Sequence, residues 1–232
     1  MIGHYTIRAG PLRQGTSFSI FDRVLFIIRP HCGLAWTTPP LSSMSSTMEA
    51  SGRTASGGCC ATSASITQIL PNKTPLDELR EVDGLILSGG AARVGLTGEL
   101  GNCGGYLSLD VPILGICAGH QFMAGFYGGR AAEAPKPEFG AATITLVDGG
   151  GAMFEGTPDE QTVWESHNDE VVQAPPGFVI TAQSESCEVQ GMENEAGDRF
   201  GLQFHPEVND SEYGARIFEN FVAVCERAHR AR

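Results

Sequence analysis

The sequence predicts a single α/β domain in which a mostly parallel central sheet is flanked by helices and carries a small antiparallel sheet. Two apolar strand-like runs, DGLILSGG at 83–90 and VPILGIC at 111–117, each lead directly into a glycine-containing loop. The second run is followed by a helical pattern, GHQFMAGFYGG at 119–129, which ends in two glycines. Short apolar runs that alternate with helical patterns are typical of a parallel sheet wrapped by helices.

The next elements are also read from apolar runs between turn residues. ITQIL at 66–70 predicts a strand, and PNKTPLDEL at 71–79 offers Pro and Thr at the start of a helix. Between 141 and 184, the runs ATITLV, TVWES and FVITAQS are separated by Gly, Pro and Asp turns. This pattern favours antiparallel hairpins over parallel crossovers.

One further strand and one helix complete the predicted order. RFGLQFHPEV at 199–208 predicts a strand, with a histidine just beyond its end. In the C-terminal segment, spacings of three and four residues separate Tyr213, Ile217, Phe221 and Val224. We therefore expect an amphipathic helix there.

The first 65 residues differ in character from the rest. Residues 1–66 hold two acidic and five basic side chains, a net of +3, whereas 67–232 hold 25 and 10, a net of −15. Apart from RVLFII at 23–28, the first part shows no useful periodicity. We therefore divide the chain into an atypical segment at 1–65, expected to be disordered or mistranslated, and a domain at 66–232. An added tail and a wrongly assigned reading frame or start codon both explain the first segment.

Composition excludes several classes of function. The net charge of 15 − 27 = −12 disfavours a nucleic-acid partner, and the longest aliphatic run, VLFII, is far shorter than the ~20 residues needed to cross a bilayer. Seven cysteines without CxxC spacing or an export signal favour free thiols in a reducing compartment. We expect a cytoplasmic protein without a membrane partner, and the acid excess suggests a halophilic, high-salt cytosol.

GICAG at 115–119 contains the strongest candidate nucleophile. It has the form G-x-C-x-G and lies directly between a predicted strand and a predicted helix. Small flanking residues permit a strained turn from which Cys117 projects, and the following backbone N–H can bind an oxyanion. The positive end of the helix favours a thiolate. A lone cysteine is ordinarily a buried structural thiol, but the two flanking glycines favour the nucleophile.

HPE at 205–207 can supply the base that a thiol nucleophile needs. The imidazole of His205 stands just past a predicted strand, proline stiffens the turn, and the carboxylate of Glu207 can reach back to the ring. Alone, such a tripeptide is more often a surface turn. Cys117 lies 205 − 117 = 88 residues earlier, so His205 can pair with it only if the fold brings the two together.

Other residues could contact a substrate beside this nucleophile. SGG follows a predicted strand, so Gly89 and Gly90 could bring backbone amides to an oxyanion, with the amide of Ala118 as a second donor. A simple tight turn is an equally good explanation of these glycines. Gln121, one helical turn further on, could hydrogen-bond a polar substrate. No histidine has ligand partners at metal spacing, so we assign no metal.

LILSGG, PILGICAGHQ and FGLQFHPE occur together in this order, and the chain thereby resembles the class I glutamine amidotransferases. The resemblance implies a flavodoxin-like α/β fold and hydrolysis of glutamine through a Cys-His-Glu triad, with the ammonia passed to a synthase. Matched by motif, Cys117 resembles the nucleophile, His205 the general base and Glu207 the residue that orients it. The positions that match oxyanion and substrate-binding residues are Gly89, Gly90, Ala118 and Gln121.

Further segments resemble the glutaminase subunit of archaeal-type GMP synthases. They are PNKTPLDEL, TGELGNC, KPEFG, VWESHNDEV and SESCEVQGM. In that subfamily the SH-x-DEV stretch borders the glutamine pocket, so Ser166, His167 and Asp169 are further substrate-binding candidates. The resemblance also implies a heterodimer: this chain needs no cofactor, while a separate ATP-pyrophosphatase subunit binds ATP and Mg and converts XMP to GMP.

Alternatives stay open. The chain could be the glutaminase subunit of another synthase, such as anthranilate synthase. It could also be a non-catalytic member, because the first segment lacks the DN…Q element with which the family opens. Thiol hydrolases of the peptidase or chaperone type share a cysteine elbow but lack the HPE turn and the LILSGG loop in this combination.

Overall fold

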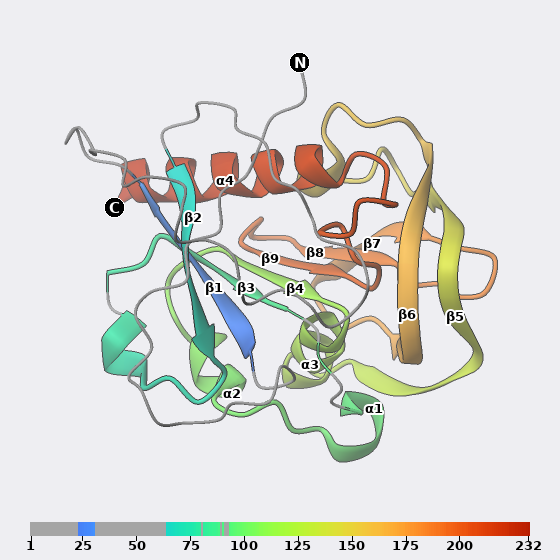
Figure 1. Ribbon diagram of the computed structural model, residues 1–232, viewed down its shortest axis with the longest axis horizontal. Coiled ribbons are helices and arrows are strands. Elements are labelled where there is room, and N and C mark those ends of the chain that lie inside the picture. Colours follow the sequence, from blue (N-terminus) through green and yellow to red (C-terminus); the bar gives the residue numbers. More distant parts are fainter. Residues whose placement is uncertain (1–22, 31–63, 80, 89, 91–92) are drawn as a thin grey trace, which may run out of the picture.

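The computed structural model describes residues 23–30, 64–79, 81–88, 90 and 93–232, which form one mixed sheet with helices on both faces (Figure 1). Within these residues the strand order is β2-β1-β3-β4-β9-β8-β7-β5-β6. The strands are β1 (Arg23–Pro30), β2 (Ala64–Pro71), β3 (Gly84–Leu87), β4 (Ile113–Ile116), β5 (Arg130–Leu146), β6 (Glu160–Gln173), β7 (Phe178–Gln183), β8 (Gly191–Asn194) and β9 (Arg199–Leu202). The helices are α1 (Val94–Thr97), α2 (Cys103–Tyr106), α3 (Ala118–Phe126) and α4 (Gly214–Ala231), with 3-10 turns η3 (Leu76–Leu79) and η4 (Ala152–Phe154).

The parallel centre of the sheet is built from the strands that the apolar runs predicted. β3 pairs with β4 and β4 with β9, both in parallel, and every residue of these three strands is buried. Burial on both faces explains why their sequences are continuous apolar runs rather than alternating ones. The carboxyl ends of β4 and β9 lead into the two catalytic candidates, Cys117 and His205.

The antiparallel part continues from this centre within the same sheet. β9, β8, β7, β5 and β6 follow one another in antiparallel pairs, which confirms the hairpins predicted for 141–184. The β5–β6 pair is much longer than the sequence runs indicated: it extends from Arg130 opposite Gln173 to Thr145 opposite Glu160. β6 is the last strand in the order, so its outer edge faces no further strand among the described residues.

At the other end, β1 lies between β2 and β3 and runs antiparallel to both. RVLFII is therefore a strand, as is ITQIL. Residues 1–22 and 31–63 lie outside the described residues, so the disorder or mistranslation of the first segment stays a prediction. The helix start expected at 71–79 is wrong: Thr74 turns back onto the carbonyl of Pro71, and only the 3-10 turn η3 fits before β3.

Two hydrophobic clusters cover opposite faces of the central strands. Side chains alternate along a strand, so Leu85 and Leu87 pack with Met123 of α3, whereas Ile86 packs with Ile217 and other residues of α4. Figure 1 shows α4 along one side of the sheet and α3 on the other. None of the described helices is long and apolar enough to cross a bilayer.

The C-terminal helix confirms most of the predicted apolar stripe. Ile217, Phe221 and Val224 of α4 are buried. Tyr213 is not part of this stripe: it precedes the helix at a left-handed φ of 56° and is 46% exposed. The helix begins one residue later, so the expected spacing started too early.

An unexpected buried cation fastens the loop before β4. Arg199, the first residue of β9, donates hydrogen bonds of 3.1, 2.8 and 2.9 Å to the carbonyl oxygens of Leu107, Leu109 and Val111. Its Nε also donates to the hydroxyl of Tyr127 at 2.9 Å. The sequence indicated only the start of a strand here, but the guanidinium provides donors for three carbonyls, of which that of Leu107 also accepts from the hydroxyl of Tyr127 at 3.0 Å.

Candidate active site

Cys117 occupies a strained turn between β4 and α3. Its φ of 50° and ψ of −109° are rare for a residue with a side chain, and the thiol is nearly buried. Both flanking glycines are required by space. A Cβ on Gly119 would overlap the carbonyl oxygen of Leu87, and one on Gly115 would lie 2.7 Å from the backbone of Gly119. The predicted G-x-C-x-G elbow is therefore present.

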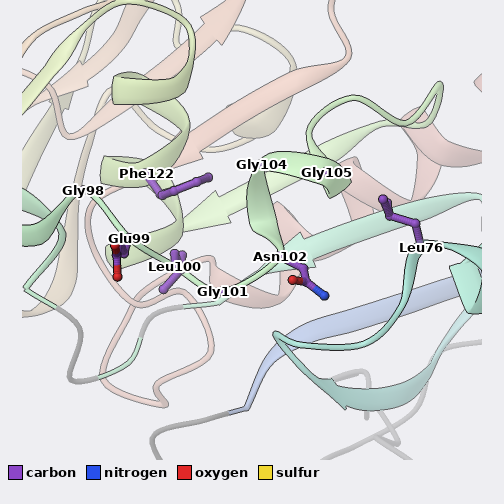
Figure 2. A pocket seen from close by; sticks show the side chains of 9 residues that line it. All are labelled: Leu76, Gly98, Glu99, Leu100, Gly101, Asn102, Gly104, Gly105 and Phe122. Carbon is purple, nitrogen blue, oxygen red and sulfur yellow. The ribbon is translucent and has the colours of Figure 1, made fainter.

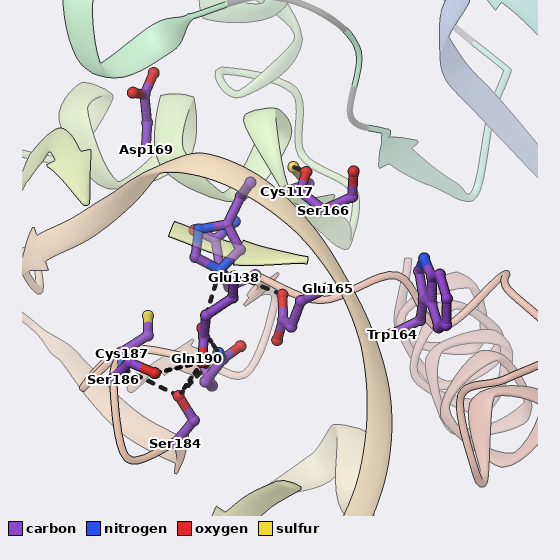
Figure 3. A network of polar contacts seen from close by, with 12 residues as sticks. Cys117, Glu138, Trp164, Glu165, Ser166, Asp169, Ser184, Ser186, Cys187 and Gln190 are labelled. Atoms are coloured by element: carbon purple, nitrogen blue, oxygen red, sulfur yellow. Dashed lines mark hydrogen bonds and ion pairs between the residues drawn. The ribbon is translucent and has the colours of Figure 1, made fainter. Parts of the chain in front are cut away.

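The thiol lies at the N-terminus of α3, which begins with the buried Ala118. The first amides of a helix have no intrahelical acceptor, and together with the helix dipole they favour a negative charge. The sulfur is 4.0 Å from the backbone carbonyl oxygen of Ser166 in β6 (Figure 3). This end of α3 therefore offers both a thiolate site and an amide for an oxyanion.

His205 and Glu207 form a hydrogen-bonded pair three residues beyond β9. Nδ1 of His205 is 2.8 Å from a carboxylate oxygen of Glu207, while Nε2 is buried without a hydrogen-bond partner in the described part of the chain. Burial lowers the pKa of His205, but interactions with the Cys117 sulfur and with Glu207 outweigh this and raise it to about 11. The imidazole thus holds a proton at neutral pH and can act as an acid toward a leaving group.

Only part of the predicted oxyanion loop can be described. Gly90 is exposed after β3, and Gly89 lies outside the described residues. Gln121 is buried one turn into α3, and its Nε2 donates to the backbone carbonyl of Asp169 at 2.6 Å and to Oε1 of Gln203 at 3.2 Å. The side-chain amide of Gln121 is thereby fixed against β6.

The three candidates on β6 divide between its two faces. Ser166 is exposed, whereas His167 and Asp169 are buried and lie on the opposite face of the strand because side chains alternate along it. Oδ1 of Asp169 accepts from Nη2 and Nε of Arg93 at 2.6 and 2.9 Å, and Oδ2 accepts from Nε at 3.0 Å. The structure therefore places the backbone of Ser166 beside the sulfur of Cys117, holds Gln121 against the backbone of Asp169, and turns the side chains of His167 and Asp169 toward protein partners.

His167 belongs to a buried polar cluster around Glu138. Figure 3 labels Glu138 with Ser184, Ser186 and Gln190 of this cluster. Nε2 of His167 is 3.1 Å from Oε2 of Glu138, and three more donors lie at 2.8–3.0 Å from its carboxylate oxygens: Ser184, Ser186 and Gln190. Burial opposes ionisation of Glu138, but these hydrogen bonds outweigh it and lower its pKa. Glu138 is thus a carboxylate that holds the Nε2–H tautomer of His167, because a carboxylate only accepts.

Glu165 is the unusual member of this cluster. It is fully buried, neither carboxyl oxygen has a hydrogen bond in the described structure, and Oε2 is 3.4 Å from Nε2 of His167. Burial, together with the charge of Glu138, raises the pKa of Glu165 to about 8. The side chain is therefore neutral at neutral pH.

Glu138, Glu165 and His167 bring three potential ligand atoms within 4.8 Å of one another, the spacing of a cation site. The donor set does not fit one. Nε2 of His167 must keep its proton to donate to Glu138, and the oxygens of Glu138 already accept four hydrogen bonds. In this cluster the carboxylate of Glu138 already has its hydrogen-bond donors, and the side chain of Glu165 beside it is a neutral carboxylic acid.

A separate hollow of about 660 Å³ lies between α2, η3 and α3 (Figure 2). It is lined by Leu76, residues 98–102, Gly104, Gly105 and Phe122. None of the predicted site residues lines it, so it is not the place where the Cys117 chemistry would occur.

Arg93, Glu138 and Glu165 were not found as site residues from the sequence. Arg93 and Glu138 gain their importance from partners distant in the chain: Arg93 pairs with Asp169, 76 positions away, and Glu138 with His167, 29 positions away. The only signals were the KPEFG segment, which contains Glu138, and the VWESHNDEV segment, which contains Glu165.

Comparison with known proteins gives the family. The model of the class-I glutamine amidotransferases matches residues 59–225, which is more than half of the chain. The chain belongs to this family. The A-type subunit of the GMP synthase (glutamine-hydrolyzing) of Archaeoglobus fulgidus is 39% identical over 162 residues, which cover 69% of this chain and 86% of that protein.

Two further relatives agree with this amidotransferase assignment. The corresponding GMP synthase subunit of Halobacterium salinarum is 43% identical over 155 residues, covering 67% of this chain and 82% of that protein. A crystal structure from Thermoplasma acidophilum, described as the same type of GMP synthase subunit, superposes with a TM-score of 0.68 at 40% identity, covering 72% of this chain and 84% of that one. The class I amidotransferase fold predicted from the motifs is confirmed.

Proposed function

We propose that this amidotransferase is the glutaminase subunit of a GMP synthase. It hydrolyses glutamine at Cys117 and supplies ammonia to a separate ATP-pyrophosphatase subunit, which converts XMP to GMP. The observation that carries the proposal is the match to relatives named as this subunit of GMP synthase, at 39% and 43% identity over 86% and 82% of their lengths.

In the proposed reaction, the thiolate of Cys117 attacks the side-chain carbonyl carbon of glutamine, and the resulting oxyanion faces the amide of Ala118. His205 gives its proton to the departing nitrogen, so the C–N bond breaks, ammonia leaves and a glutamyl thioester remains. Water, deprotonated by the same imidazole, then attacks the thioester and releases glutamate and the thiol. Glu207, at 2.8 Å from Nδ1, keeps the other ring nitrogen directed to the sulfur.

The substrate-binding roles of Gln121 and Ser166 are supported by their positions on α3 and β6, and those of Gly89 and Gly90 by the LILSGG motif. We assign the glutamine contacts to Gly89, Gly90, Gln121 and Ser166. Gln121 is supported from behind by the carbonyl of Asp169. His167 and Asp169, which face protein partners, act through the shape of the β6 backbone rather than by touching the substrate.

The partner and its cofactors are also part of the proposal. ATP and Mg²⁺ bind to the ATP-pyrophosphatase subunit, and the two chains form a heterodimer in the cytoplasm. The acid excess of this chain, with a net charge of −12, supports a high-salt cytosol.

Ammonia release from glutamine tests the proposal. The purified chain is assayed alone and with an archaeal-type ATP-pyrophosphatase subunit, ATP, Mg²⁺ and XMP, beside Cys117→Ala as the matched control. We expect release that increases with partner and XMP, with formation of GMP, and that is lost in the variant.

Two results would contradict parts of the proposal. Release that persists in Cys117→Ala would remove the nucleophile. Release by the wild type that is Cys117-dependent but increases only with another synthase, such as the anthranilate synthase component, would retain the glutaminase and replace the GMP pathway.

A further inference from the structure

The outer edge of β6 pairs with no further described strand, but loop segments from elsewhere in the chain contact its backbone. β6 is the last strand of the described sheet, so its outer peptide groups have no neighbouring strand among the described residues. Thr162, Trp164 and Ser166 alternate along the strand, and their outer backbone groups point the same way. The backbone of Thr162 contacts Glu212, and that of Trp164 contacts His205 and Ser211. The backbone of Ser166 contacts Cys117.

At Trp164 the edge binds the residue that carries the proposed base. The amide of His205 donates to the carbonyl oxygen of Trp164 at 2.9 Å. In an antiparallel ladder the reverse bond would run directly from Trp164 to His205. Here the hydroxyl of Ser211 is inserted: it accepts from the amide of Trp164 at 2.9 Å and donates to the carbonyl of His205 at 2.7 Å. Ser211 is buried, and this single hydroxyl completes the pair.

The next outer group of the same strand meets the nucleophile. The carbonyl oxygen of Ser166 is 4.0 Å from the sulfur of Cys117, and Figure 3 shows the two side by side. Residues two apart on a strand are separated by about 6.6–6.8 Å. One rigid strand therefore places the backbone of His205 and the sulfur of Cys117 at neighbouring positions.

We propose that Ser211 is a positioning residue, which holds the imidazole of His205 against Cys117 by fixing the backbone of His205 on β6. The inference rests on the proposed glutaminase reaction. Without the hydroxyl, the amide of Trp164 loses its partner and the carbonyl of His205 keeps only the amide of Val208, at 3.2 Å. The backbone of His205 is then tied to β6 by its own amide alone. A displacement of ~1 Å between reacting groups costs up to ~100-fold in rate.

Glu212 provides a matched control on the same segment. Its amide donates to the carbonyl of Thr162 at 2.8 Å, and its carboxylate accepts from the amide of Thr162 at 2.7 Å. Thr162 therefore resembles Trp164 in that its carbonyl binds a backbone amide and its amide binds a side chain. It lies two residues further along β6 from the Cys117 contact than Trp164 does. Replacing Glu212 weakens the docking of the segment without touching the links of His205.

The experiment compares Ser211→Ala, Ser211→Thr and Glu212→Ala in the full chain. Glutamine hydrolysis is measured with the partner subunit, ATP, Mg²⁺ and XMP to obtain kcat and KM. Alkylation of Cys117 by iodoacetamide is followed across pH by peptide mass spectrometry, because a thiol paired with imidazolium reacts at lower pH than a free one.

For Ser211→Ala we expect kcat to fall about 10- to 100-fold with KM within about twofold, and the alkylation profile to move to higher pH. Ser211→Thr, which keeps the hydroxyl, and Glu212→Ala should both stay within about threefold of wild type. The proposal is overturned if Ser211→Ala keeps its kcat, if Glu212→Ala loses as much, or if the alkylation profile does not move. If the wild type releases no ammonia, the proposed function fails, and the alkylation profile alone still decides the role of Ser211.

Discussion

Replacing Glu165 with glutamine should remove a pH-dependent loss of stability. Burial and the charge of Glu138 raise the pKa of Glu165 from 4.5 to about 8, against smaller opposing effects of His205 and Gln190. The folded state therefore keeps a proton that the unfolded chain loses above pH 4.5. By linkage, the free energy of unfolding falls as pH rises through this interval, by at most ~1.4 kcal/mol per pH unit. Glutamine has no such proton to lose.

The difference between wild type and Glu165→Gln isolates this contribution. Between about pH 5.5 and 7.5, the variant should gain roughly 2–3 kcal/mol relative to wild type. Urea unfolding followed by tryptophan fluorescence measures it, with Glu160→Gln, which changes an exposed carboxyl at the start of the same strand, as the matched control. Stability curves that run parallel for Glu165→Gln and wild type would refute the reasoning that Glu165 is a buried neutral acid.

Three further predictions follow from packing and charge. Arg199→Met leaves the carbonyls of Leu109 and Val111 without donors and that of Leu107 with the hydroxyl of Tyr127 alone, and should cost about 3–5 kcal/mol in urea unfolding; a loss below ~1 kcal/mol would mean that water replaces the guanidinium. Gly119→Ala, whose Cβ would overlap the carbonyl oxygen of Leu87, should lower glutamine hydrolysis ~100-fold, while Gly125→Ala, with open space around its Cβ, should not; equal activities would contradict the elbow. Residues 67–232 carry a net charge of −15, so raising KCl from about 0.1 to 2 M should raise the thermal midpoint by several degrees; an unchanged or lower midpoint would argue against self-repulsion.

The proposed catalytic pair, Cys117 and His205, could be predicted because its signals are local. The apolar runs before Cys117 and His205 identify β4 and β9, and the glycines around Cys117 identify the elbow. Glu207 lies two residues from His205, so its role also needed no long-range information. In a parallel arrangement the ends of neighbouring strands meet at one edge, and this joins the two motifs.

Other features depend on contacts that no local pattern encodes. The strand pattern at 199–202 does not indicate that the guanidinium of Arg199 binds the carbonyls of 107–111. Nor does the local sequence indicate that strand alternation turns the side chain of His167 toward Glu138, 29 positions earlier. No local pattern distinguishes Ser211 from the other serines of the sequence. Its proposed positioning role follows only from its contacts with Trp164 on the outer edge of β6 and with His205.

Selective labelling of Cys117 by a glutamine-like electrophile tests the central claim most directly. Cys103, Cys187 and Cys225 are buried, and burial raises the pKa of each thiol, that of Cys103 to about 12, so these thiols should not react. Among the four cysteines of the described residues, we expect an adduct on the Cys117 peptide alone, prevented by excess glutamine and greatly slowed in His205→Asn. An intact Cys117 that stays unlabelled even with the partner subunit present, or labelling that glutamine does not prevent, would contradict a glutaminase site at this cysteine.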